Sequence, residues 1–137
     1  MTGCTKNAAV PADLPTPGAA AARACEQLAK DLPESLGQGL SRRKTTPESP
    51  LLAAWGSPPA VLRCGVPVDA AYKTGDQVIE VGAEGKTVDW YAVKRGDQVV
   101  WSTPLATVHV ELIVPSKYQG SGLLARLTPA VSSVRVL

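Results

Sequence analysis

From residue 51 onward the chain alternates apolar and polar residues with a period of two. Short runs rich in Val, Ile, Thr and Trp are separated by Gly, Pro, Asp and Lys, which is the spacing of an antiparallel meander. These runs predict strands at residues 51–55, 60–64, 77–81, 87–94, 98–103 and 107–114. The last run is the most regular, because one face carries Val108, Val110, Leu112 and Val114.

The first and last parts of the chain have a helical period instead. Residues 19–32 are strong helix formers bounded by proline on both sides, and Cys25, Leu28, Ala29 and Leu32 make one apolar stripe at i, i+3, i+4 and i+7. Residues 122–136 begin helically with Ser121 as a candidate N-cap, and Pro129 either kinks this helix or opens a second segment. The pattern predicts an α+β fold: an N-terminal helix, an antiparallel sheet of about five or six short strands, and a C-terminal helix on the same sheet.

Residues 1–18 differ from the rest in composition. Residues 5–18 hold three prolines in short polar stretches and show neither apolar period, which is typical of a linker. We therefore expect residues 1–18 to be an anchor remnant and tether, and residues 19–137 to form a single α+β domain. Within that domain the Arg95-Gly96-Asp97 turn predicts a hairpin with Trp90 and Trp101 as cross-strand neighbours.

Composition narrows the classes of function only slightly. The chain of 137 residues is 45% hydrophobic and has no Phe, so the core must rest on Val, Leu and Ala. Its 14 Lys and Arg residues against 12 Asp and Glu residues give a field too weak to argue for a nucleic-acid partner. There is no run of about 18 apolar residues to cross a membrane.

Cys4 is the candidate lipidation site. Thr2-Gly3-Cys4 resembles the end of a bacterial lipoprotein signal, at which the cysteine thiol accepts diacylglycerol. The order of anchor, proline-rich spacer and domain supports this interpretation, and it predicts that a signal peptide has been removed ahead of residue 2. The alternative is an incidental thiol in a flexible tail.

Cys25 and Cys64 remain as a pair. In a small exported domain such a pair is most simply a disulfide. A metal site would need two further soft or nitrogen ligands, and the single histidine is His109. A reactive thiol is the remaining alternative, and no metal or cofactor is expected.

Several segments together resemble a family of small exported actinobacterial proteins known only as a domain of unknown function. The matching segments are Ala24-Cys25, Ala54-Trp55-Gly56, residues 61–66, Val88-Asp89-Trp90, Trp101-Ser102-Thr103, and residues 110–115 followed by Tyr118. They span about Cys25 to Val131. The resemblance implies an exported, often lipid-anchored protein in which Cys25 and Cys64 are paired, and it carries over no catalytic residue.

Three sets of residues are candidates for function. His109 and Glu111 share a strand face and could act as general base and partner, although a Thr-His-Glu face is also the ordinary wet side of a sheet. Arg63 lies in an apolar strand, where it points outward or needs a buried carboxylate. The tryptophans Trp55, Trp90 and Trp101 belong either to the core or to an exposed aromatic patch.

By elimination, the sequence favours a noncatalytic lipoprotein domain of the cell envelope. Its expected location is extracytoplasmic, anchored to the outer face of the membrane through Cys4 or secreted. Its expected partner is an envelope protein or polymer. The alternatives are a small-ligand or glycan binder that uses the tryptophans and Arg63, and, more distantly, a hydrolase built on His109 and Glu111.

Overall fold

The computed structural model describes residues 8–134, and Cys4 therefore lies outside the described residues. The elements follow in the order β1 (Val10–Pro11), α1 (Ala19–Asp31), β2 (Arg42–Arg43), β3 (Thr45–Thr46), β4 (Leu52–Trp55), β5 (Ala60–Cys64), β6 (Ile79–Ala83), β7 (Lys86–Arg95), β8 (Gln98–Ser102), β9 (Val110–Pro115) and α2 (Gly120–Ser132). No helix in this part of the chain has the length and apolar character needed to cross a membrane.

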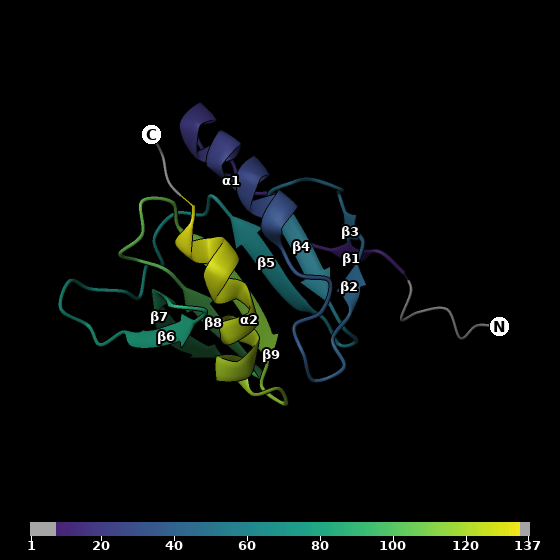
Figure 1. The fold of residues 1–137 in the computed structure, drawn as a ribbon. Helices are drawn as coiled ribbons and strands as arrows, with labels where there is room; N and C mark the ends of the chain where they lie inside the picture. The colour runs from purple at the N-terminus through teal and green to yellow at the C-terminus, as the bar shows by residue number, and fades with distance from the viewer. Residues whose placement is uncertain (1–7, 135–137) are drawn as a thin grey trace.

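Seven strands form one antiparallel sheet in the order β2-β4-β5-β9-β8-β7-β6 (Figure 1). The α+β class is confirmed, but the strand count of five or six was too low. The additional strand, β2, and the separate parallel pair β1–β3 have two residues each. Strands this short produce no alternation that a sequence pattern can reveal.

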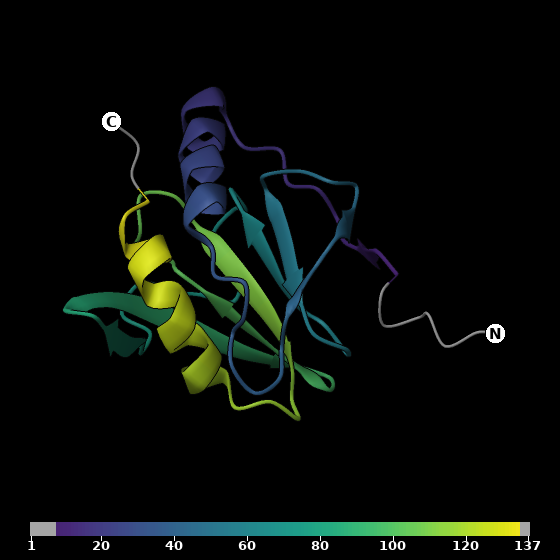
Figure 2. The same cartoon turned by 45° about the vertical axis from the view of Figure 1, so that its right-hand side comes forward.

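Both helices pack on this sheet, as predicted, and Figures 1 and 2 show that they cover the same face of it. The core lies between the helices and this face. Cys25 of α1 and Cys64 of β5 are fully buried there and form the expected disulfide, with Cα atoms 5.8 Å apart. The cysteine on the apolar stripe of α1 thus fastens that helix to the sheet.

The central strands β5 and β9 alternate buried and half-buried residues, and the strongest period-2 segment of the sequence is confirmed. The strand itself begins at Val110 instead of residue 107, because the chain first makes a loop in which the Thr103 hydroxyl accepts a hydrogen bond from the Val110 N–H. Trp90 and Trp101, expected to be cross-strand neighbours, are not directly opposed. Trp101 stands opposite Ala92, so the two indoles are diagonal neighbours on the helix side.

The other face of the sheet is covered at β4 by the N-terminal segment. All four residues of β4 are buried, β1 pairs in parallel with β3, and Val10 is buried. Further along, Pro17 lies so close to Gly65 that a Cβ there would stand 2.8 Å from the proline ring. Residues 10–18, expected to be a free spacer, therefore lie against the domain.

Helix α2 begins two residues earlier than predicted and continues through Pro129 to Ser132. Its N-cap is Gln119, with no side-chain hydrogen bond, so Ser121 is not the cap. Gly120 packs against the Trp101 indole, where a Cβ would stand 2.7 Å from the ring. Helix α2 packs on β6 and β7, and its last turn lies near the first residues of β7.

Candidate functional site

The three tryptophans, predicted as core or binding residues, lie in or against the core. Trp55 and Trp90 have no exposed surface, and Trp101 is half-buried against the same cluster. The indole N–H of Trp55 donates to the carbonyl of Pro33, and the guanidinium of Arg42 lies 5.4 Å from its ring centre. Neither Trp55 nor Trp90 presents aromatic surface to a ligand.

Arg63 lies on the face of the sheet away from the helices. Its guanidinium makes a 2.6 Å ion pair with the carboxylate of Glu111, which stands directly opposite on β9, and donates a second bond to the carbonyl of Asp13. The side chains are only 24% and 15% exposed. The carboxylate that a half-buried arginine needs is thus supplied by Glu111, and Arg63 ties the N-terminal segment to the sheet.

The structure does not join His109 and Glu111 into a catalytic pair. The Nδ1 of His109 lies 3.0 Å from the carbonyl oxygen of Thr103, at the base of the β8–β9 loop, while Glu111 is engaged by Arg63. No hydrogen bond links the two side chains. The two residues share a strand face, as the spacing predicts, but each has a different structural partner.

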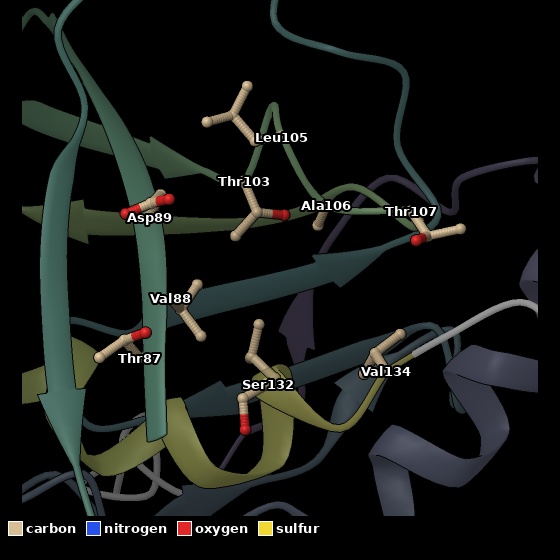
Figure 3. Close-up of a pocket in the computed structure, with 10 residues that line it drawn as sticks. Thr87, Val88, Asp89, Thr103, Leu105, Ala106, Thr107, Ser132 and Val134 are labelled. Carbon is tan, nitrogen blue, oxygen red and sulfur yellow. The ribbon is translucent and has the colours of Figure 1, made fainter. Parts of the chain in front are cut away.

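A hollow at the other end of the sheet has a volume of about 530 Å³. We call it the β7–α2 hollow. Figure 3 shows its three sides, made by the start of β7, the loop after β8 and the end of α2. Its lining residues are Thr87, Val88, Asp89, Thr103, Leu105, Ala106, Thr107, Val131, Ser132 and Val134.

The lining of the hollow combines aliphatic side chains with hydroxyls and one carboxylate. Leu105 is 61% exposed, the largest exposed fraction among the large hydrophobic residues that the structure describes. The carboxylate of Asp89 makes no hydrogen bond or ion pair within residues 8–134, and Glu80 stands directly opposite it on β6. Two like charges at a directly opposed position destabilise a sheet. The hollow therefore offers an apolar contact and a carboxylate that has no partner among the described residues.

The loop of residues 66–78 is held to the sheet next to this region. The Asp69 carboxylate accepts two hydrogen bonds from Arg95, and the Tyr91 hydroxyl bonds to the carbonyl of Ala71 and the carboxylate of Asp76. Partial desolvation and the negative charge of Asp76 raise the pKa of Tyr91 above 10.0. These contacts fasten the loop to Tyr91 and Arg95 of β7, and no residue of the loop lines the β7–α2 hollow.

In the described part of the chain, no three His, Cys, Asp or Glu side chains gather in a geometry that could hold a metal ion. A second hollow of about 390 Å³ lies on the sheet face away from the helices, between the N-terminal segment and Arg63. Its one arginine is already paired with Glu111. The β7–α2 hollow differs from it in having the strongly exposed Leu105 beside its carboxylate.

Reasoning from the sequence missed the β7–α2 hollow because none of its residues forms a recognisable motif. A usable signal was present in the strand lengths. The turn at Gly96-Asp97 pairs β7 with β8 residue by residue, so a ten-residue strand beside a five-residue strand must extend past its partner. The hollow lies at that extension.

Among known proteins, this chain matches one family model. Neither the curated proteins nor the solved structures contain a match to this chain. Residues 2–135 match a protein family that is described as "Protein of unknown function (DUF3515)". Because the match covers nearly the whole sequence, the chain belongs to this family of proteins of unknown function.

Proposed function

We propose that the protein is a noncatalytic domain of the cell envelope that binds an envelope protein or polymer through the β7–α2 hollow. The observation that carries the proposal is the hollow itself, with an exposed Leu105 and an Asp89 carboxylate that has no partner within residues 8–134. Exposed apolar surface beside uncompensated charge is typical of an interaction site.

The buried Cys25–Cys64 disulfide supports an extracytoplasmic location, because such bonds persist in oxidising compartments. We further propose that Cys4 carries the lipid that holds the protein at the outer face of the membrane. Cys4→Ser is expected to move the protein from the membrane fraction to the soluble fraction or medium. Intact mass measurement of the mature protein checks this, and an unmodified Cys4 would contradict the anchor.

The other two candidate functions have less support. A glycan binder would use exposed aromatic faces, but Trp55 and Trp90 are fully buried and Arg63 is paired with Glu111 on the opposite face of the sheet. A hydrolase would need His109 and Glu111 to act together beside a nucleophile, and each of them is bonded elsewhere. The hollow contains neither residue.

The test is complementation of a deletion strain with variants that leave the core intact. Leu105→Asp is expected to abolish function, because it removes the apolar contact and a charged carboxylate would have to lose its water on binding. The matched control is Leu14→Asp, since Leu14 is also exposed (47%) but lies on the N-terminal segment. His109→Ala is likewise expected to complement, because His109 lies outside the hollow.

Denaturation midpoints of the purified variants verify that each remains folded. If Leu105→Asp complements as well as the wild type, the β7–α2 hollow is not the binding surface. If His109→Ala and Glu111→Gln each abolish function while the fold is intact, the domain is not a noncatalytic binder.

A further inference from the structure

The backbone at the β7–α2 hollow has an unpaired strand edge. Strand β8 runs beside β7 only as far as the pair Tyr91↔Ser102, after which the chain turns away into the loop that lines the hollow. On its opposite side β7 stays paired with β6 down to Lys86. Among the residues that the structure describes, residues 87–89 are therefore paired on one side only, and the other side faces the hollow.

The antiparallel register shows which backbone groups face the hollow. Arg95 and Gln98 flank a two-residue turn and form a hydrogen-bonded pair. Because the direction of the backbone groups alternates along a strand, every second residue before Arg95 directs its N–H and C=O groups to the β8 side. These residues are Val93, Tyr91, Asp89 and Thr87. The turn at the other end gives the same result. Ala83 and Lys86 flank it, so Lys86, Val88 and Trp90 face β6.

The groups on Thr87 and Asp89 have no partner across the hollow. Within residues 8–134, no backbone or side-chain hydrogen bond joins either residue to the facing loop or to α2. Two N–H and two C=O groups thus lie along about 10 Å of strand, at roughly 3.3 Å per residue, inside a walled cavity. Unpaired strand edges of this kind are templates for another extended chain.

We propose that the β7–α2 hollow binds an extended polypeptide segment of the partner, which pairs with the backbone of Thr87 and Asp89 in the place that β8 leaves. This inference rests on the proposed function and names its partner class. The segment carries a lysine or arginine opposite Asp89, because Asp89 and Glu80 form an acidic pair on that face. The next side chain of the segment points to the other face, where Val88 and Val131 are buried, and is therefore small and apolar.

The test selects binders from a phage library of random heptapeptides, using the oxidised domain as bait. Synthetic peptides from the selected phage are expected to contain a basic residue next to an apolar one and to be extended when bound. Replacing alternate peptide N–H groups by N-methyl groups is expected to weaken binding about tenfold at those positions and little at the positions between, because only one side of a strand faces β7. Equal effects at all positions would overturn strand pairing.

Two substitutions at Thr87 distinguish the contribution of its backbone to peptide affinity from that of its side chain. Thr87→Pro removes an N–H that β6 does not use, whereas Thr87→Val removes only the hydroxyl. Peptide affinity is expected to fall about tenfold in Thr87→Pro and to change less than about twofold in Thr87→Val. Asp89→Asn is expected to lower peptide affinity severalfold, and the difference from the wild type is expected to be smaller at high salt. Equal affinities of Thr87→Pro and Thr87→Val would overturn the proposal.

Glu80→Pro distinguishes peptide binding at this edge from peptide binding at the outer edge of β6. By the same register, the N–H of Glu80 points to that outer edge. Loss of peptide binding in Glu80→Pro but not in Thr87→Pro would place the peptide on β6 and contradict the inference. Should Thr87→Pro fail to fold, the N-methyl series decides the question on the wild-type domain. If Leu105→Asp abolishes complementation while no peptide pairs with β7, the proposed function stands and this inference fails.

Discussion

At the β4–β5 end of the sheet both faces are covered, whereas at the β6–β7 end one strand edge is left open. The first end has α1, fastened by the Cys25–Cys64 disulfide, on one face and the N-terminal segment with Val10 on the other. The second end has α2 on one face, the loop of residues 66–78 touches the other face near Tyr91 and Arg95, and β7 extends beyond β8. We attribute stability mainly to the first end, and the binding that we propose belongs to the second.

The largest expected effect is on the covered end. Cys64→Ala should lower the free energy of unfolding of the oxidised domain by up to about 4 kcal/mol, because the bridge closes a long loop in the unfolded chain. The two cysteines are 39 residues apart. Urea denaturation measures the loss, with the reduced wild type as reference. A loss under about 1 kcal/mol would mean that the disulfide contributes little.

Gly65→Ala tests whether the N-terminal segment is part of the covered end. Gly65 has φ +87° and faces the Pro17 ring, so a methyl group adds a clash to the backbone strain, and we expect a loss of about 2–3 kcal/mol. The matched control is Gly75→Ala, at φ +96° with open space around it, which should cost only about 1 kcal/mol. Equal losses in denaturation would show that residues 10–18 do not pack on the domain.

A smaller effect is expected at the ion pair under the N-terminal segment. Glu111→Gln leaves the half-buried guanidinium of Arg63 without its carboxylate, and about 1–2 kcal/mol of stability should be lost. Glu80→Gln at the open end removes a like charge opposite Asp89, and stability should stay within about 0.5 kcal/mol of the wild type or rise slightly. A larger loss of stability in Glu80→Gln than in Glu111→Gln would contradict the assignment of stability to the β4–β5 end.

The smallest expected effect is on the titration of Tyr91. Desolvation and the Asp76 carboxylate raise its pKa, so the neutral phenol is favoured in the fold. The associated stability is therefore present below pH 10 and is lost as the pH rises through the raised pKa. Asp76→Asn should lower the pKa of Tyr91 toward its ordinary value, which an ultraviolet absorbance titration detects. An unchanged titration would mean that Asp76 does not contribute.

The helix-covered face of the β4–β5 end was predicted from the sequence, whereas the N-terminal segment on its other face and the hollow at the open end were not. Cys25 lies on a helical stripe and Val110, Leu112 and Val114 on a regular strand, so period and burial agree there. The short strands β1, β2 and β3 depend on tertiary pairing and give no periodic signal. The β7–α2 hollow depends on where β8 stops, and that depends on the loop bond between Thr103 and Val110.

Amide hydrogen exchange, resolved by residue along β7 in the free domain, tests the open edge most directly. The register predicts alternation: the amides of Val88 and Trp90, paired with β6, are protected, and those of Thr87 and Asp89 exchange fast. Tyr91, paired with Ser102, marks the point at which protection on the β8 side begins. Uniform protection through residues 87–91 would contradict the account, because the edge that we assign to partner binding would already be filled.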